Sequence, residues 1–408
     1  MNAFTKPVQQ MSANDMMEEL KWFAQNELAN NILPFWASKT VDITNKGFFG
    51  KIDDKNNIDI NADKGLILNA RILWTFSAVS RKMGSELYKN LAFMAYDYIF
   101  RYFYDDSYKG FYWKLNCKGE PVETKKQVYA EAFVIYALSE YYLLTGEREC
   151  FDKALETFRL IEKYSFDPIL KGYSEAFDRQ WQQINDLRLS TKDMNEKKTM
   201  NTHLHILEAY TNFYRIYKID ELKNTITELL NVFYDNILNK IDYHYNLFFD
   251  ENWKIKSNQI SFGHDIEGSW LMLEAAEVIG NEDLINKFKK ISVQMADACL
   301  KGIFPSGALS QDIKRGSTIL AEDLEWWVQA EAVVGFLSAY KVSGRIDFLK
   351  AAYNEAKFIN SYIVDHEYGE WHNLVNAKGE VIAGHDKAGF WKCPYHNSRM
   401  CLELLARI

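Results

Sequence analysis

The sequence predicts an all-α fold, an (α/α)6 barrel with short β-hairpins in the connecting loops. Six short segments rich in Gly, aromatic residues and Asn or Asp recur along the chain, with starts roughly 60 to 70 residues apart, which indicates repeated supersecondary units. Amphipathic helical patterns alternate with patterns that are apolar on nearly all sides. Only six prolines interrupt 408 residues, so long helices are permitted. An open helical solenoid would show the same pattern, and we expect the closed barrel.

In chain order, each repeat is expected to hold an outer helix, a hairpin and an inner helix. The outer helices, each with one apolar side, are expected at 14–32, 85–104, 149–165, 219–238, 283–302 and 347–363. The hairpins are expected at Gly47–Ile58, Gly110–Val122, Gly172–Trp181, His244–Trp253, Phe304–Asp312 and Gly369–Ile382. The more apolar inner helices are expected at 64–80, 127–145, 200–216, 264–279, 323–341 and 395–407. The loops at one end of such a barrel would be free to build a cleft.

Composition narrows the possible functions. The net charge is −8 and no basic stripe is present, so nucleic acid is not an expected partner. The five cysteines are scattered without a CxxC pair, which indicates neither a disulfide framework nor a zinc site. No apolar run approaches the roughly 18 residues that cross a bilayer, so no membrane association is expected. The aromatic fraction of 15% suits either core packing or a carbohydrate cleft.

The domain organisation follows from the same pattern. Residues 1–13 are polar and aperiodic, and we expect a flexible tail. Residues 14–408 contain no linker-like stretch, so we expect a single catalytic domain. The N-terminus lacks the basic start and apolar run of a secretory signal, which predicts a cytoplasmic protein. We expect a monomer or a weak homodimer.

The stretch Ser261–Trp270 carries the clearest chemical pattern. His264, Glu267 and Trp270 are spaced i, i+3 and i+6, which puts a base, a carboxylate and an aromatic plate along one side of two helical turns. The other inner helices also carry polar or aromatic residues near their starts, where an apolar helix would not need them: Arg71, Tyr129, His203, Trp327, Glu331 and His396.

Three of these residues are histidines from three different repeats. A lone histidine early in a helix is more often a cap or a satisfied core residue. His203, His264 and His396 occupy similar places although the chain has only eight histidines, which favours one shared cavity. His205 is two residues from His203 and must point elsewhere. Because His203 shares a stripe with apolar neighbours on the core side, we expect it to be the inward histidine.

Histidines suit proton transfer near neutral pH, whereas glycosidases normally use paired carboxylates. Removing a proton next to a carbonyl needs a base, an acid and a stabiliser for the enediolate, and a second base on the opposite face inverts the configuration. The set therefore favours aldose epimerisation or isomerisation. A metal site is not expected, because no two of the chosen histidines lie at i, i+4 on one helix. Arg71 could bind sugar oxygens or form a structural ion pair with a carboxylate.

Four segments resemble the N-acylglucosamine 2-epimerase superfamily. They are Lys198–His205, Gly263–Glu267, Glu325–Glu331 and Pro394–His396, and the resemblance covers nearly the whole chain after the tail. It implies the (α/α)6 barrel and a cofactor-free deprotonation and reprotonation at C2 of a reducing sugar. The implied substrates are β-1,4-linked disaccharides such as cellobiose and lactose, whose reducing-end glucose would become mannose.

The resemblance also implies residue roles. His264 and His396 would be the acid/base pair, and His203 would stabilise the cis-enediolate. Arg71 would bind the oxygens at C1 and C2, and Glu267 and Glu331 would orient the histidines and bind hydroxyls. The remaining substrate contacts would come from Tyr129, Trp270, Trp327 and Trp391. Epimerisation or aldose–ketose isomerisation of monosaccharides, N-acylglucosamine epimerisation, glycoside hydrolysis and non-catalytic sugar binding remain alternatives.

Overall fold

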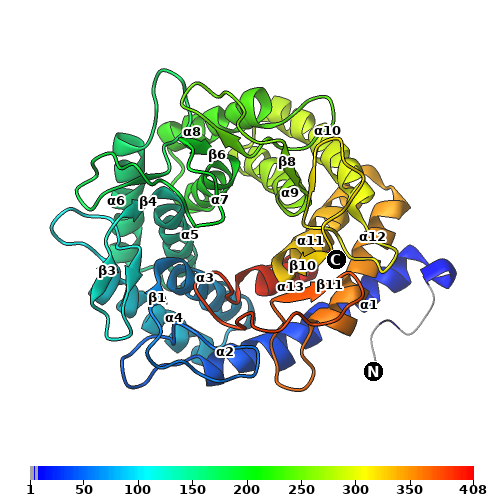
Figure 1. Cartoon of the computed structure of the whole chain (residues 1–408), viewed down its shortest axis with the longest axis horizontal. Coiled ribbons are helices and arrows are strands. Elements are labelled where there is room, and N and C mark those ends of the chain that lie inside the picture. The colour runs from blue at the N-terminus through cyan, green and yellow to red at the C-terminus, as the bar shows by residue number, and fades with distance from the viewer. Residues whose placement is uncertain (1–3, 5–7) are drawn as a thin grey trace.

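The helices form two concentric rings around a central axis (Figure 1). The computed structural model describes residue 4 and residues 8–408. Within them, the six inner helices are α3 (Leu66–Met83), α5 (Val128–Thr145), α7 (Met200–Ile216), α9 (Phe262–Ile279), α11 (Trp326–Ser343) and α13 (Tyr395–Arg407). Each inner helix packs against the next, and α13 packs against α3, so the ring is closed. The predicted (α/α)6 barrel is confirmed, and an open solenoid is excluded.

The outer ring covers the inner one with amphipathic helices. In the part of the chain that the structure describes, these helices are α1 (Ala13–Glu27) with α2 (Leu33–Lys39), α4 (Glu86–Tyr98), α6 (Arg148–Tyr164), α8 (Asp220–Val232), α10 (Glu282–Cys299) and α12 (Ile346–Phe358). Helix α6 illustrates why they lie here. It buries Phe151, Phe158 and Ile161 on the side that packs against α5 and leaves its charged residues largely in solvent.

The N-terminal tail lies partly outside the described residues, at positions 1–3 and 5–7. Phe4 is buried and its ring contacts those of Phe23 and Tyr353. Val8–Gln10 forms one turn of 3-10 helix before α1. Ser12 caps α1 by a reciprocal pair of hydrogen bonds with Asp15, which satisfies amide groups at the start of the helix.

Short strands join successive units of the barrel. Directly before five of the described inner helices lie β1 (Lys64–Gly65), β4 (Lys126–Gln127), β6 (Lys198–Thr199), β8 (Gln259–Ser261) and β10 (Asp323–Glu325). Each pairs antiparallel with a strand of the next unit, namely β2 (Lys114–Leu115), β5 (Ala176–Phe177), β7 (Phe248–Phe249), β9 (Asp312–Lys314) and β11 (Leu374–Asn376). β3 (Pro121–Glu123) extends the first of these sheets. A bridge between Ile52 and Ala388 completes the circle.

This pairing adds to the predicted hairpins, which form local bridges such as Phe177 to Gln183 and Phe249 to Ile255. The pairing between units is the part that sequence patterns do not reveal, because each strand has only two or three residues. The strand pairing ties the start of each inner helix to the following unit. It therefore holds the N-termini of the inner helices in a fixed arrangement at one end of the barrel.

Buried lysines tie the segments that precede the inner helices to the turns that follow the outer helices. Lys64, at the start of β1, donates to Asp42 at 2.8 Å and to the Lys46 carbonyl at 2.9 Å. The same arrangement recurs between Lys126 and Asp105, Lys198 and Asp167, and Lys387 and Asp365. The acceptor turns contain left-handed residues; Gly47, for example, has φ +66°. Glycine adopts this conformation without a steric cost, which explains its recurrence in the six predicted segments.

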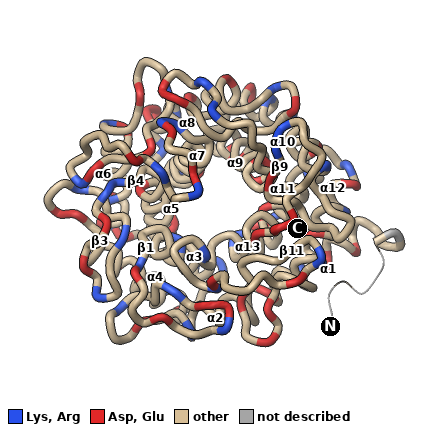
Figure 2. Tube along the Cα trace, in the orientation of Figure 1, with Lys and Arg blue, Asp and Glu red and all other residues tan. Residues whose placement is uncertain are grey.

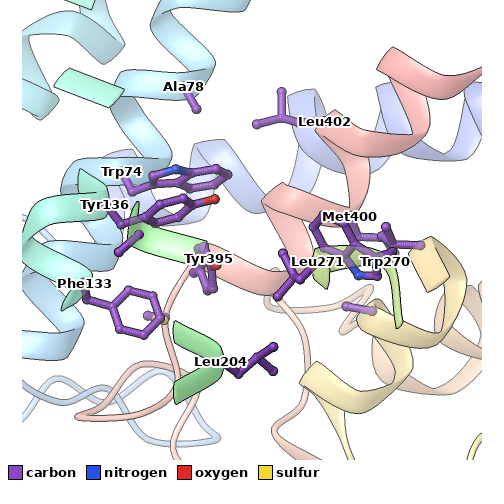
Figure 3. Close-up of a cluster of buried hydrophobic side chains, with 14 of the residues drawn as sticks. Trp74, Ala78, Phe133, Tyr136, Leu204, Trp270, Leu271, Tyr395, Met400 and Leu402 are labelled. Carbon is purple, nitrogen blue, oxygen red and sulfur yellow. The ribbon is translucent and has the colours of Figure 1, made fainter. Parts of the chain in front are cut away.

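The inner helices bury nearly all their faces, as their apolar sequences predict. Trp74 of α3 and Tyr136 of α5 stack with ring centroids 5.3 Å apart, and the Tyr395 ring meets Trp74 edge-on at 5.1 Å (Figure 3). Charged residues of both signs are spread over the outer helices and loops (Figure 2). Among the described residues, no helix combines the length and the apolar character that crossing a membrane requires.

Glu355 of α12 is a fully buried carboxyl group with no cationic partner among the described residues; the Leu309 backbone amide is the polar group near it. Burial raises its pKa well above the ordinary value. In the unfolded chain the Glu355 carboxyl group loses its proton near pH 4.5, whereas in the folded chain it keeps the proton to higher pH. Glu355 therefore makes the folded protein less stable as pH rises. We expect Glu355→Met to raise the free energy of unfolding by about 1 to 3 kcal/mol at pH 8 and by less at pH 4. Urea unfolding at both pH values measures this, and equal effects at the two values would contradict it.

Candidate active site

Side chains from the first turns of the inner helices meet near the barrel axis. The ring of Trp327 contacts two histidines, with its centroid 4.8 Å from that of His264 and 5.6 Å from that of His396. Trp327 comes from α11, His264 from α9 and His396 from α13. Two of the three histidines chosen from the sequence therefore meet at one indole ring.

His264 is held in place by the residue that caps its helix. The Ser261 hydroxyl caps α9 and hydrogen-bonds His264 Nδ1 at 2.8 Å, which leaves Nε2 without a protein partner in the described part of the chain. Burial, with a smaller contribution from His205, lowers the pKa of His264 to about 3. The imidazole is therefore neutral near pH 7 and can accept a proton at Nε2.

His396 is held by carboxylates instead. Its Nδ1 lies 2.7 Å from Glu331 Oε1 and 4.0 Å from Glu267 Oε1. The Trp326 ring stands edge-on to the imidazole at 5.5 Å. Burial lowers the pKa of His396 well below its ordinary value. The hydrogen bond to Glu331 fixes the ring orientation, and this carboxylate can stabilise the imidazolium that forms when Nε2 takes a proton.

Arg399 joins three buried carboxyl groups behind the histidines. Its guanidinium donates to Glu267 at 2.5 Å and to Glu331 at 2.7 Å, and it also contacts Glu208. Tyr395 donates to Glu208 as well. Burial and the neighbouring Glu331 raise the pKa of Glu267 to about 8, whereas Arg399 keeps the pKa of Glu208 low. One arginine thus balances a cluster of acids that would be costly to bury alone.

The third inward histidine is His205, and the prediction of His203 for this place is wrong. His205 Nδ1 lies 2.9 Å from Glu208 Oε2, and its ring contacts Tyr129 at 4.9 Å. His203 faces the outer layer. Its Nδ1 donates to the Thr199 carbonyl at 2.6 Å, and its Nε2 accepts from the Tyr173 amide at 2.9 Å. Both nitrogens of His203 are used in the fold, so neither is left for chemistry.

Comparison of the repeats explains this reversal. His203 is the fourth residue of its helix. The fourth residues of α5, α9 and α11 have the same role, because the side chain of each accepts a hydrogen bond from a backbone amide of the adjacent turn. They are Glu131, Asp265 and Gln329. The sixth residues of α3, α7, α9 and α11 are the inward ones: Arg71, His205, Glu267 and Glu331. Aligning the repeats would have identified His205 from the sequence.

The same comparison gives a prediction that separates the two histidines. In α11 the glutamine Gln329 accepts the backbone amide equivalent to the one that His203 accepts in α7. We therefore expect His203→Gln to keep kcat within about threefold and to lower the free energy of unfolding by about 1 kcal/mol. His205→Gln is expected to lower kcat by about 10²-fold or more while leaving the fold intact. Steady-state kinetics and urea unfolding of both variants check this. Equal activity losses would contradict the assignment.

Arg71 and Tyr129 lie together opposite the acid cluster. Arg71 donates to the Tyr129 hydroxyl at 2.8 Å and approaches the Trp391 carbonyl at 3.5 Å. Its contacts in the described chain include no carboxylate, so the structural ion pair considered from the sequence is not formed. The Arg71 Nε atom is buried without a partner. A buried, unsatisfied donor beside two imidazoles is suited to bind the oxygen of a ligand.

The three tryptophans occupy different positions. Trp327 contacts both His264 and His396, and Trp391 is 38% exposed at the rim, beside Trp113. Trp270 does not border the site as predicted. It is buried in a cluster with Leu271 and Met400 (Figure 3), and its indole Nε1 donates to Glu331 at 3.3 Å. Being one turn further along α9 than Glu267, it lies below the acid cluster and supports it.

A cavity of about 300 Å³ opens beside His264. Polar groups on its wall include Asn201, Gln259 and Asp312, and part of its lining is the irregular segment 187–194. The carbonyl oxygen of the Asn201 side chain is buried without a partner. The cavity can therefore admit a polar ligand next to His264.

Glu267, Glu331 and His396 have ligand atoms within 4.8 Å of one another, as a metal site would require. Arg399 already donates to both carboxylates and supplies the positive charge that a metal would bring. The geometry thus favours an organic acid/base centre. Sequence inspection missed the groups that support this centre, Glu208, Tyr395 and Arg399. Arg399, for example, bonds acids that lie 68, 132 and 191 positions away in the sequence.

Comparison with known proteins agrees with this geometry. A family model described as N-acylglucosamine 2-epimerase matches residues 47–399. The cellobiose 2-epimerase of Bacteroides fragilis is 45% identical over 390 residues, which cover 96% of this chain and 100% of that protein. That of Dictyoglomus turgidum is 38% identical, covering 93% of this chain and 97% of its own. The structure of cellobiose 2-epimerase from Bacillus thermoamylovorans has a TM-score of 0.91 at 39% identity, covering 97% of this chain and 100% of that one.

Proposed function

Because the chain belongs to the N-acylglucosamine 2-epimerase family, we propose that it epimerises the reducing-end glucose of cellobiose and related β-1,4-linked disaccharides at C2 to give mannose. The observation that carries this proposal is that two imidazoles from different helices, His264 and His396, both contact the ring of Trp327. Each has one nitrogen held by the protein and the other free to exchange a proton. Two such bases are what inversion at one carbon requires.

The reaction begins when one of the two imidazoles helps to open the sugar ring and expose the C1 aldehyde. One base then removes the C2 proton, and the electron pair forms a cis-enediolate. Arg71 binds the oxygens at C1 and C2, and His205, oriented by Glu208, donates to the developing oxyanion. The opposite histidine, in its imidazolium form after taking a proton from solvent, gives that proton to the other face of C2, and the first histidine releases the proton it removed to solvent. Glu331 stabilises the imidazolium form of His396 during this exchange.

Incubation with cellobiose, followed by chromatography of the products, tests the proposal. Glucosyl-mannose is expected as the main product, with no free glucose. Parallel incubations with glucose, mannose and N-acetylglucosamine test the monosaccharide alternatives, because fructose or epimerised monosaccharide as the main product would replace the disaccharide assignment. Release of two monosaccharides would indicate hydrolysis instead.

Two further proposals concern the protein in solution. The first is that the working form is a monomer or a weak homodimer. Sedimentation equilibrium measures this directly, and an inactive monomer would contradict it. Cytoplasmic residence also remains a prediction, which fractionation of the producing cells would test.

A further inference from the structure

A buried polar network lies at the seam where the first unit of the barrel meets the last. Glu370 is fully buried in the turn before β11. Its Oε1 accepts from Lys392 Nζ at 2.5 Å and from Asn397 Nδ2 at 2.8 Å, and its Oε2 accepts from Trp36 Nε1 at 2.7 Å. One carboxylate thus binds groups from α2, from the segment before α13 and from α13 itself.

Both partners on the C-terminal side are chain neighbours of site residues. Lys392 directly follows Trp391, and Asn397 directly follows His396. The Lys392 ammonium also lies 4.1 Å from the centroid of Trp326, the ring that stands edge-on to His396. Glu370 therefore acts on the rim tryptophan and on the acid/base histidine through one residue each, without touching either.

Glu370 is itself held firmly from outside the barrel. Its backbone is left-handed, with φ +64°, a conformation that a residue with a side chain adopts at a cost. The side-chain oxygen of Asn31 accepts a hydrogen bond from the Glu370 backbone amide at 2.7 Å. The side-chain NH2 of Asn31 donates to Glu27 at 2.5 Å, and Glu27 also accepts a hydrogen bond from the Trp371 indole. Equivalent turns, such as those of Gly47 and Gly110, have glycine at this place, and several buried hydrogen bonds hold the glutamate here in a conformation that glycine adopts freely.

We propose that Glu370, acting through Lys392 and Asn397, is a positioning residue that sets the placement of Trp391 and His396 in the active site. The inference rests on the proposed function for the role of His396. The opposing interpretation is a purely structural ion pair. Replacing a buried pair by neutral groups of similar shape is often harmless to folding, so the two interpretations can be separated.

The test variant is Glu370→Gln with Lys392→Met, which removes both charges together and leaves none unpaired. We expect kcat for cellobiose to fall about tenfold or more, because small displacements of a catalytic group cost at least this much. KM is expected to rise as well, because Trp391 moves. Lys392→Arg alone keeps the charge and is expected to retain more activity than Lys392→Met alone.

The control is Asp42→Asn with Lys64→Met. This pair is equally buried, with side chains 1% exposed, and its other contacts, which include the Lys46 carbonyl, the Tyr98 ring and Asn45, lie outside the site. It should lose a similar amount of thermal stability while kcat and KM stay within about twofold. Comparable activity losses in both double variants, or wild-type kinetics in the Glu370 and Lys392 variant, would overturn the proposal.

A readout that does not depend on turnover separates this proposal from the assigned reaction. The fluorescence of Trp391 is obtained by subtracting the signal of the protein that carries Trp391→Phe from the signal of the same protein with Trp391 intact. This is done in the wild type and in the double variant, and the quenching of the difference signal by acrylamide is measured in each. We expect the quenching constant of Trp391 to change in the Glu370 and Lys392 variant and not in the control. An unchanged constant contradicts the positioning role even if the substrate is a different sugar.

Discussion

The His264→Asn and His396→Asn variants are expected to turn over cellobiose about 10²- to 10⁴-fold more slowly than the wild type. Each loses one of the two groups that exchange a proton with C2. Asparagine keeps a hydrogen-bonding group that can reach Ser261 in the first variant and Glu331 in the second, so the fold should be preserved. Steady-state kinetics at saturating cellobiose measures the loss in kcat.

The control for these variants is His366→Asn. His366 is exposed, and its Nε2 contacts the carbonyl of Asn360, a residue that is not part of the site, at 2.7 Å. Its activity should equal that of the wild type. If either site variant keeps more than about a tenth of the wild-type kcat, general acid/base catalysis by that histidine is ruled out.

The Arg399→Met variant is expected to lose about 3 to 5 kcal/mol of stability, because it leaves Glu208, Glu267 and Glu331 buried without their shared cation. The pKa of Glu267 is already raised, and without Arg399 these acids hold their protons to still higher pH. A raised folded-state pKa means that stability is lost as pH rises, so the deficit should be larger at pH 8 than at pH 5. Urea unfolding at the two pH values measures both effects.

Arg407→Met is the matched control on the same helix. Arg407 pairs with Glu403, and both side chains are partly exposed, so its loss should cost no more than about 1 kcal/mol. Adding Glu208→Gln to Arg399→Met should restore part of the stability by removing one uncompensated acid. A deficit that does not depend on pH, or that equals the Arg407 effect, would show that Arg399 does not balance the acid cluster.

The arrangement of helices could be predicted from sequence because it depends on local periodicity. The expected inner helix at 200–216 coincides with α7, and the expected outer helix at 149–165 differs from α6 by one residue at each end. Strand pairing between units could not be predicted, because it joins segments about 50 residues apart through two or three residues each. The hydrogen bonds of Glu370 at the seam could not be predicted either, because its partner Trp36 lies 334 positions away in the sequence.

The site shows where single-helix reasoning fails. Residues two apart on a helix point to opposite sides, so the choice between His203 and His205 depended on assigning the apolar stripe correctly. Both sides of α7 are buried, one against the outer layer and one against the axis, and a buried helix has no polar face to settle the choice. Trp270 failed for a related reason. It lies six residues further along α9 than His264, where Glu331 and Met400 enclose it rather than a ligand (Figure 3).

The central claim is that His264 and His396 act on opposite faces of one carbon, and hydrogen exchange in D2O tests it most directly. The wild type should place solvent deuterium at C2 of the epimerised product. Each single His→Asn variant should exchange the C2 hydrogen of only one of the two epimers, and the two variants should act on different epimers. If both variants exchange the same epimer, or if the wild type carries the original hydrogen into the product, the two histidines do not flank C2 as proposed.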